Sequence, residues 1–329
     1  MYDVFGLGNA LVDTEVAVND RFLQTQQIAK GLMTLVDSER MAELTHELAD
    51  QPMQRFSGGS GANTIFSVQG FGLRAGYTCK VAQDAVGDFF INELSAAGID
   101  VNANAQTDEG RSGQCLIMVT DDAERTMNTD LGISVQLSSL DVPDQALRQS
   151  TYCYVEGYLS ASEPSAAAAI HCREVAEQAG VKVSLSLSDP SMVELFRDAL
   201  STMLGNGVDQ VFCNEEEALA WAKTDRLDIA MSELRDIAPE VYITLGAQGS
   251  VAVTNHTQHQ APGLSVKAVD TTGAGDIYAG AVLAARLQGA EPLQAAKFAN
   301  YCAGHIVTLH GARLKSIAEY QKLQTGYTG

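Results

Sequence analysis

The sequence predicts an α/β fold with a mostly parallel central sheet, helices on both of its faces, and a small β-sheet lid. From Tyr152 onward, strand-like runs alternate with helical stretches, which is typical of parallel strands joined by crossover helices. Two strand-like runs, Gly113–Thr120 and Arg125–Asn128, lie around an acidic turn and predict a β-hairpin. Hairpins inserted into α/β chains tend to form a separate sheet, so we assign this one and the alternating strand Thr14–Val18 to the lid.

The composition is that of a soluble enzyme. The chain has 329 residues, of which 46% are hydrophobic and 19% charged, so it can bury a large core. Its formal net charge of −20 disfavours binding to nucleic acids and to anionic membranes. No apolar stretch is long enough to span a membrane and no signal peptide is visible, so we expect a cytoplasmic protein, either a monomer or a homodimer.

The spacing of cysteines and histidines indicates neither disulfides nor a metal site. The cysteines never occur as C-x-x-C and most have apolar neighbours, so we expect buried, reduced thiols. The histidines show no metal-ligand spacing, and we interpret them as structural or exposed. The cysteines are Cys79, Cys115, Cys153, Cys172, Cys213 and Cys302, and the histidines are His46, His171, His256, His259, His305 and His310.

Val4–Gly8 is predicted to be a short buried strand. The G-L-G sequence at 6–8 lacks the third glycine of a dinucleotide fingerprint, and no P-loop pattern occurs in the chain. Asn9 and Asp13 follow this strand, where open parallel sheets bind ligands. A carboxylate there can accept hydrogen bonds from a sugar diol, and an amide can both donate and accept. An Asx turn leaving the strand is the alternative interpretation.

A glycine-rich turn at Ser57–Asn63 opens a predicted helix. Its glycines allow close contact between the backbone and a ligand, and Asn63 would project from the first helical turn. A tight turn without a ligand is the alternative, but a second turn of this kind later in the chain favours a ligand. Ahead of this turn, Asp37 is predicted to cap a helix over about 38–48.

The other regular elements follow from apolar periodicity. The predicted strands are Thr78–Val81, Tyr152–Glu156, Val181–Leu187, Gln210–Cys213, Val241–Leu245 and Ser265–Val269. The predicted helices are Asp88–Ala97, Pro164–Gln178, Met192–Met203, Glu215–Lys223 and Ile229–Ile237.

Two motifs in the second half suit contacts with a nucleotide. Asn214 and Glu217 stand at the end of a predicted strand, where carboxylates can orient Mg²⁺ through water molecules. A capped helix with acidic residues in its first turn is the competing interpretation. Thr244, Gly246 and Gly249 lie in a strand–turn–strand whose glycines suit close approach of a nucleotide.

The most informative stretch is Asp270–Asp276, which leads from the predicted strand at 265–269 into a helix of small residues. Small residues at such a turn let backbone N–H groups approach an anion, and the helix N-terminus adds donors and positive potential. Asp276 lies in the first turn, where it can accept the proton of a hydroxyl that receives a phosphoryl group. A glycine-rich turn with a capping aspartate is the alternative.

Together these motifs resemble the ribokinase or PfkB carbohydrate-kinase family over essentially the whole chain. Asp270–Asp276 is similar to the C-terminal signature of the family at every position, and 58–63 resembles its N-terminal signature. Asn214 and Glu217 resemble its N-x-x-E element, and 244–249 resembles its T-x-G-x-x-G strand. Four matches in the order of the family make coincidence a poor explanation.

The resemblance implies a ribokinase-like, Rossmann-type three-layer sandwich with a small β-sheet lid. The implied core comprises residues 1–10, 58–107 and 131–329, and the implied lid comprises 11–57 and 108–130.

The resemblance also implies an ATP- and Mg²⁺-dependent kinase. The catalytic residues would be Asp276 as the base, Gly273, Ala274 and Gly275 as the anion hole, and Arg125 as an aid to phosphate transfer. The substrate-binding residues would be Asn9, Asp13, Gly58, Gly59, Ser60, Asn63 and Tyr158. The nucleotide-binding residues would be Asn214, Glu217, Thr244, Gly246, Gly249 and Asn300, with Glu217 also holding Mg²⁺ through water.

The acceptor is expected to be a nucleoside, adenosine first, phosphorylated on its 5′-hydroxyl. The spacing of Asn9 and Asp13 resembles the adenosine-kinase branch, whereas the sequence at 61–63 is more similar to sugar kinases. A free sugar such as ribose or fructose is therefore the alternative acceptor, and a catalytically silent nucleoside- or sugar-binding regulator is a third hypothesis. Binding of K⁺ near Gly311 stays open, because Lys315 stands where a small polar ligand would be expected.

Overall fold

The centre of the fold is a sheet with the strand order β16-β15-β14-β13-β12-β11-β1-β5-β7. The computed structural model describes residues 1–102, 106–107, 109–122, 124–254 and 257–329, so His256 lies outside the described residues. Neighbouring strands from β14 to β7 run parallel, and β15 and β16 add antiparallel pairs at one edge. The strands are β1 (Tyr2–Leu7), β5 (Ala75–Thr78), β7 (Asp100–Val101), β11 (Ser150–Glu156), β12 (Lys182–Ser186), β13 (Gln210–Asn214), β14 (Glu240–Thr244), β15 (Ser250–Thr254) and β16 (Gln258–Ala261).

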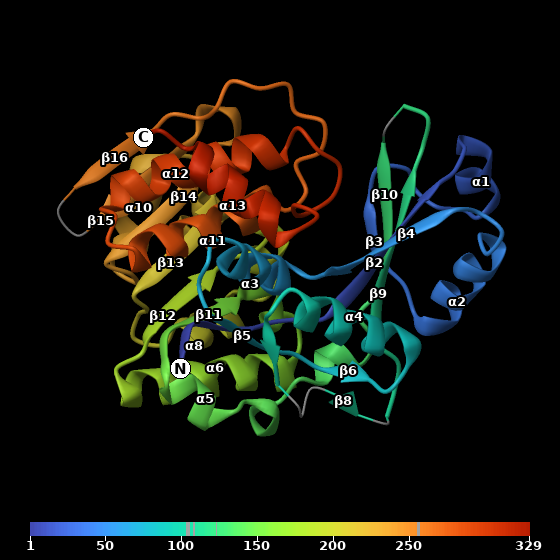
Figure 1. Cartoon of the computed structure of the whole chain (residues 1–329), viewed down its shortest axis with the longest axis horizontal. Coiled ribbons are helices and arrows are strands. Elements are labelled where there is room, and N and C mark those ends of the chain that lie inside the picture. The colour runs from blue at the N-terminus through green and yellow to red at the C-terminus, as the bar shows by residue number, and fades with distance from the viewer. Residues whose placement is uncertain (103–105, 108, 123, 255–256) are drawn as a thin grey trace.

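Helices cover both faces of this sheet, which confirms the predicted three-layer α/β fold (Figure 1). Successive residues of a strand point to opposite faces, so in β11 Tyr152 and Tyr154 enter one apolar core while Cys153 and Val155 enter the other. The first core contains residues of α3 (Ser60–Gly70), α4 (Ala85–Ala96), α11 (Ala274–Leu287), α12 (Pro292–Ile306) and α13 (Ile317–Gly326). The second contains residues of α5 (Asp144–Arg148), α6 (Glu163–Ala179), α7 (Pro190–Leu195), α8 (Arg197–Leu204), α9 (Glu215–Ala222) and α10 (Leu227–Arg235).

A separate, smaller sheet has the order β3-β10-β9-β2-β4 and lies beside the core (Figure 1). As predicted, β9 and β10 form an antiparallel hairpin and β2 joins it, pairing parallel with β9. A third apolar cluster packs two helices on this sheet, and its fully buried members include Leu44 and Met118. The division of the chain into core and lid segments stays a prediction. The elements are β2 (Leu11–Ala17), β3 (Met33–Leu35), β4 (Met53–Gly58), β9 (Gly113–Val119), β10 (Arg125–Asp130), α1 (Asp20–Thr25) and α2 (Ser38–Glu47).

The predicted strand at 265–269 is wrong. Its residues are exposed and pair with no neighbouring strand, although Leu264, Val266 and Ala268 all face one cavity. The alternation of side chains is therefore real, but it reflects a cavity wall and not a hydrogen-bonded ladder. Apolar periodicity records which side of an extended chain is covered, and it does not record what covers it.

Several other predicted elements have different bounds. The predicted helix 192–203 is two helices, α7 and α8, which meet at Phe196, where the backbone leaves helical geometry (φ −121°, ψ 26°). The predicted strand 78–81 is divided between two strands: Thr78 is the last residue of β5, and Val81 is the first residue of the short strand β6 (Val81–Ala82). Strand β6 pairs with β8 (Gln106–Thr107). The helix predicted from Asp88 begins at Ala85, because Asp84 accepts a hydrogen bond from the Gly87 N–H and caps it.

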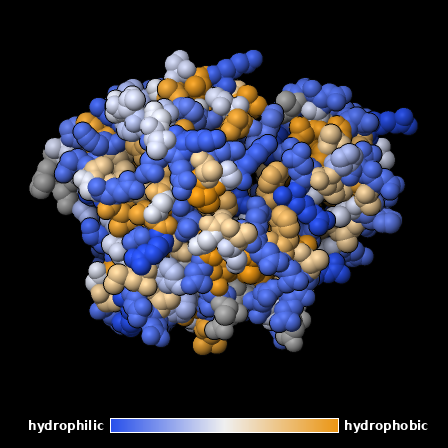
Figure 2. Space-filling view, viewed as in Figure 1, coloured by the Kyte–Doolittle hydropathy of each residue, from blue (hydrophilic) through white to orange (hydrophobic). Residues whose placement is uncertain are grey.

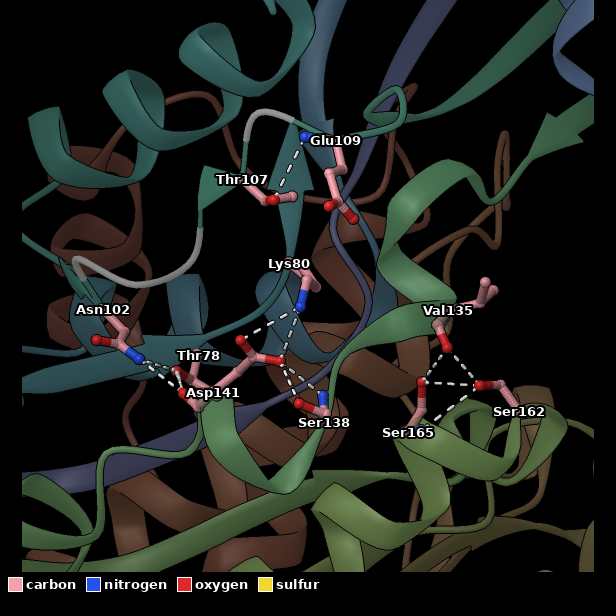
Figure 3. Close-up of polar contacts among 10 residues, drawn as sticks. All are labelled: Thr78, Lys80, Asn102, Thr107, Glu109, Val135, Ser138, Asp141, Ser162 and Ser165. Carbon is pink, nitrogen blue, oxygen red and sulfur yellow. Dashed lines mark hydrogen bonds and ion pairs between the residues drawn. The ribbon is translucent and has the colours of Figure 1, made fainter. Parts of the chain in front are cut away.

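A polar network ties the chain that follows the small sheet to the end of β5 (Figure 3). The Asp141 carboxylate accepts hydrogen bonds from Lys80 Nζ at 3.1 and 3.3 Å and from the N–H and hydroxyl of Ser138 at 2.8 Å. Asn102 Nδ2 donates to the Asp141 carbonyl and to Thr78 Oγ1. Hence the segment that returns from β10 to the core is fixed at the carboxyl edge of the central sheet.

The surface and the cysteines agree with the composition. Figure 2 shows a mainly hydrophilic face with smaller hydrophobic patches between. None of the described helices is long and apolar enough to cross a membrane. As expected, the six cysteines are buried thiols.

We predict that Gly280→Val destabilises the protein by about 1–3 kcal/mol, because overpacking forces helices apart. A Cβ at Gly280 of α11 would lie 2.6 Å from the Ser67 Cβ and 2.8 Å from the Thr64 carbonyl oxygen of α3. Urea denaturation followed by circular dichroism measures the loss. Gln321→Val, at an exposed position of α13, is the control and should cost roughly 0.5 kcal/mol. Equal costs for both variants would contradict close α3–α11 packing.

Candidate active site

Two glycine-containing turns that are far apart in the sequence meet at the Asp276 carboxylate. Its Oδ1 accepts a hydrogen bond from Ser60 Oγ at 2.6 Å, and its Oδ2 accepts one from Asn63 Nδ2 at 3.1 Å. Asp276 lies in the first turn of α11, whereas Ser60 and Asn63 lie in the first turn of α3. The structure thus brings the N-termini of these two helices together, where unpaired backbone N–H groups and positive dipole ends favour a negative charge.

Glycines at two positions make this approach possible. Gly59 has φ +94°, and a Cβ there would lie 2.5 Å from the Asn9 carbonyl oxygen. Gly273 has φ +74°, and a Cβ there would lie 1.9 Å from the Ala312 carbonyl oxygen. An L-residue would meet both backbone strain and a collision at either site. At Gly275, by contrast, a Cβ would meet open space, so this residue faces the cavity described below.

Asp13 lies close to this junction, on the first strand of the small sheet. A Cβ at Gly58 would lie 2.3 Å from Asp13 Oδ2, so the carboxylate packs directly on the Gly58 backbone. Burial raises the pKa of Asp13 to about 7, while the charges of Arg313 and Arg125 oppose the rise. Burial likewise raises the pKa of Asp276 to about 6, against the hydrogen bonds it accepts. Two neighbouring carboxyl groups thus have pKa values raised above the ordinary range of an aspartate.

Glu156 connects the predicted acceptor residues, and motif reasoning gave it no role. It is 1% exposed at the end of β11, where its Oε1 accepts from the Asn9 N–H at 2.6 Å and its Oε2 accepts from the Gly61 N–H at 2.5 Å. Asn9 is itself buried, and its carbonyl accepts from the Tyr77 hydroxyl. Burial raises the pKa of Glu156 to about 7. Its position at a strand end was the available signal, but its partners come from contacts that the sequence does not show.

Arg125 reaches from the small sheet to the signature turn. Its Nη1 forms ion pairs with Glu15 Oε2 at 2.9 Å and with Asp270 Oδ2 at 3.1 Å. Asp270 also accepts hydrogen bonds from the N–H groups of Thr272 and Gly311. The buried Nε of Arg125 has no partner among the described residues. Arg125 is therefore tied to the first residue of the signature turn, while its buried Nε–H is unpaired within the described part of the chain.

A cavity of about 230 Å³ adjoins the signature turn. Four of the six predicted nucleotide residues line it together with Ala274 and Gly275, namely Thr244, Gly246, Gly249 and Asn300. Asn300 Nδ2 donates to the carbonyls of Ala261 at 2.9 Å and Pro262 at 3.2 Å, which fixes one wall. Helix α12 and its C-terminal cap contribute Asn300, Ala303, Gly304 and Val307, spaced i, i+3, i+4 and i+7, and residues from 263–268 form a further part of the wall. The additional residues, which motif reasoning missed, include Gly263, Leu264, Val266, Ala268, Ala303, Gly304 and Val307.

Asn214 and Glu217 are not among the residues that line this cavity. They form a capping box on α9: Asn214 Oδ1 accepts from the Glu217 N–H, and both carboxyl oxygens of Glu217 accept from Asn214. Glu217 is 4% exposed, and burial raises its pKa to about 7. Direct binding of Mg²⁺ by this carboxyl group does not fit these contacts, and a water-mediated contact stays a prediction. No group of three or more His, Cys, Asp or Glu residues in the described part of the chain could hold a metal.

Tyr158 and Lys315 complete the set of predicted residues. Tyr158 is partly buried in the turn Gly157–Ala161 after β11, and burial, with the nearby charges of Asp189 and Asp276, raises its pKa well above its usual value. Tyr158 is thus close enough to the junction for the charge of Asp276 to influence its pKa. Lys315 is exposed, and its N–H donates to Glu319.

This arrangement can be compared with known proteins. Residues 32–318 match the family described as "pfkB family carbohydrate kinase". The chain belongs to the pfkB family of carbohydrate kinases. Among solved structures, this pfkB kinase is similar to the adenosine kinase from Sinorhizobium meliloti, with 34% identity and a TM-score of 0.87 over 98% of this chain and 99% of that one.

Curated relatives with different names are similar to this pfkB kinase at comparable levels. The ATP-dependent ribose-1-phosphate kinase of Halopiger xanaduensis is 27% identical over 85% of this chain and 90% of its own length. The adenosine kinase of Saccharomyces cerevisiae is 28% identical over 86% and 88%. Family membership confirms the predicted ribokinase-like fold and makes this protein a phosphotransferase with a hydroxyl acceptor. These relatives are named for different acceptors.

Proposed function

We propose that this pfkB kinase transfers the γ-phosphoryl group of ATP to the 5′-hydroxyl of a nucleoside, adenosine first. The observation that carries the proposal is the Asp276 carboxylate, which accepts hydrogen bonds from the N-terminal glycine turn while the adjoining residues Ala274 and Gly275 line the cavity. A proton acceptor with a raised pKa thus lies between the predicted acceptor residues and the predicted nucleotide cavity. Transfer between two bound substrates requires this order of groups.

The proposed roles follow from the geometry. Asp276 takes the proton of the attacking hydroxyl, after that hydroxyl displaces or joins its present partners Ser60 and Asn63. The N–H groups of the 273–275 turn, at the N-terminus of α11, face the developing charge on the transferred group. Arg125 contributes positive charge from the small sheet. Mg²⁺ bound together with ATP would supply further neutralisation of phosphate charge.

A nucleoside is the favoured acceptor for two reasons. The Asn9–Asp13 spacing resembles adenosine kinases, and the Sinorhizobium meliloti adenosine kinase is similar over nearly the full length of both chains. Free sugars remain the second candidate, because the 61–63 sequence is closer to sugar kinases and the Halopiger xanaduensis relative is named for a sugar phosphate. A silent regulator is disfavoured, since the signature turn 270–276 is present and its Asp276 contacts Ser60 and Asn63 of the N-terminal glycine turn.

We predict a preference for nucleosides in an ADP-release assay with ATP and Mg²⁺ and a matched panel of adenosine, inosine, guanosine, ribose and fructose. If the site recognises the base, kcat/KM for adenosine should exceed that for ribose by several hundredfold, or about 3–4 kcal/mol. Equal or better use of a free sugar would overturn the acceptor but leave the chemistry. No ADP release with any member would favour the regulator.

We predict that Asp276→Asn lowers kcat by about 10²–10⁴-fold, because the amide cannot accept the proton. The variant should keep its affinity for ATP, since the cavity walls are unchanged. Asp198→Asn makes the same substitution in the first turn of α8, at an exposed position, and serves as the control with kcat unchanged. Near-normal turnover by Asp276→Asn would remove Asp276 from the role of base.

We predict that kcat/KM falls as the pH drops through about 7 to 6, well above the pH at which an ordinary aspartate is protonated. Both carboxyl groups have raised pKa values, so each loses its charge early on acidification, and the proposed roles of Asp13 and Asp276 require the charged forms. The two groups interact, so the apparent values belong to the pair. A pH profile that is flat down to pH 5 would contradict the prediction. In Asp13→Asn, the remaining acidic limb should lie nearer 6.

A further inference from the structure

Arg313 is a buried cation near Asp13 that the proposed mechanism does not use. Its side chain is 7% exposed, on the loop between α12 and α13. Its Nη2 donates to Ser57 Oγ at 2.5 Å and to Glu93 Oε1 at 2.7 Å, and its guanidinium carbon lies 4.2 Å from the centroid of the Phe66 ring. Arg313 therefore joins β4, α4 and α3, and stacking on Phe66 fixes the plane of its fork.

These contacts place Arg313 next to the wall on which Asp13 rests. Ser57, its hydrogen-bond partner, directly precedes Gly58, and the Asp13 carboxylate packs on the Gly58 backbone. Ser57 is 1% exposed, so this wall has little freedom to adjust. The remaining terminal nitrogen of Arg313, Nη1, is buried without a partner among the described residues. Only one of the two terminal nitrogens of the guanidinium, Nη2, thus donates to Ser57 and Glu93.

The charges around Asp13 show what Arg313 adds. Four charged groups influence the Asp13 carboxyl group: Arg313 and Arg125 favour its ionised form, while Asp276 and Glu93 disfavour it. Of the two cations, Arg313 has the larger influence. Arg125 is already shared between Glu15 and Asp270, which leaves Arg313 as the main local source of positive charge for Asp13.

The same short loop also contacts the signature turn. The Gly311 N–H donates to Asp270, and the Ala312 carbonyl packs against Gly273. Residues 311–313 therefore touch the predicted anion hole at one end and the Asp13 wall at the other. A change at Arg313 should act on the Asp13 side, because Gly311 and Ala312 make their contacts through the backbone.

We propose that Arg313 is a positioning residue of the acceptor site, which holds Ser57 and Gly58 against Asp13 and supplies the charge that keeps Asp13 ready to accept hydrogen bonds from the substrate hydroxyls. This inference rests on the proposed function, in which Asp13 binds the acceptor. Arg313 acts through Asp13 and takes no part in the transfer of the phosphoryl group.

Steady-state kinetics of Arg313→Gln test the proposal, with adenosine and ribose as probes. KM for the acceptor should rise at least about tenfold, because the Asp13 carboxylate loses its main cation and its wall. KM for ATP and kcat should change by less than about threefold. Arg313→Lys keeps the charge but not the fork, and should recover part of the loss. Equal rises in both KM values would indicate a general structural role and overturn the proposal.

A double-mutant cycle with Asp13→Asn separates an effect through Asp13 from any other effect. If Arg313 acts through Asp13, Arg313→Gln should add less than about a twofold change in KM for the acceptor in the Asp13→Asn background. Additive effects would contradict the proposal. Arg173→Gln is the matched control: Arg173 is also a buried arginine, bonded to the Met203 carbonyl and Glu177 on the opposite face of the sheet. It should lower the melting temperature without changing KM.

Titration of ¹³C-carboxyl-labelled aspartates by NMR tests the influence of Arg313 on Asp13 even if neither adenosine nor ribose is phosphorylated. The Asp13 signal is assigned by its absence in Asp13→Asn. In Arg313→Gln the pKa of Asp13 should rise by about one unit or more, because removal of a nearby cation disfavours the carboxylate. An unchanged pKa overturns the inference whatever the acceptor proves to be. Conversely, a raised pKa together with no phosphorylated acceptor would refute the proposed function and leave the Arg313–Asp13 link standing.

Discussion

The position of the partly buried Asp276 carboxylate between two helix N-termini is the constraint on which the rest of the site depends. A carboxylate removed from water is costly unless hydrogen bonds and nearby positive potential stabilise it. Ser60 and Asn63 of α3 donate these hydrogen bonds to Asp276 of α11. They can do so only if the two helices pack closely. Gly280 allows that approach at their crossing, and Gly273 allows the signature turn to lie on Ala312.

The electrostatics of the site follow from this burial and from the acidity of the chain. Burial raises the pKa values of Asp13, Glu156, Glu217 and Asp276 alike, so the chain places several acids with raised pKa values on β2, β11, α9 and α11. Such a group of acids repels a free anion. A phosphate group therefore needs local compensation, which the N–H groups of the signature turn and a buried arginine can provide. A neutral acceptor with several hydroxyls meets no such barrier, since carboxylates are good acceptors for its O–H groups.

The sequence predicts the parts of this protein that local patterns encode, and fails where distant contacts decide. Strand and helix alternation predicts the central sheet, and the glycine turns predict where a ligand would bind, because both depend on neighbouring residues. The stretch predicted as a strand, 265–269, has the right alternation, but only the fold shows that Val266 and Ala268 line a cavity. Similarly, Glu156 ends a recognisable strand and Arg313 stands in an irregular loop. Their partners lie 95 to 256 residues away, so no local pattern could assign them.

Arg125 shows how the small sheet and the signature turn depend on each other. Its guanidinium joins Glu15 on β2 to Asp270, and Asp270 is also held by the N–H groups of Thr272 and Gly311. An anion that enters the neighbouring turn competes with Asp270 for the same guanidinium, because both are negatively charged. If Arg125 moves to the anion, Asp270 keeps its two backbone donors, while β10 loses an anchor on the core. The ion pair between Arg125 and Asp270, with 14% exposure on the arginine side and 3% on Asp270, therefore links the small sheet to the signature turn.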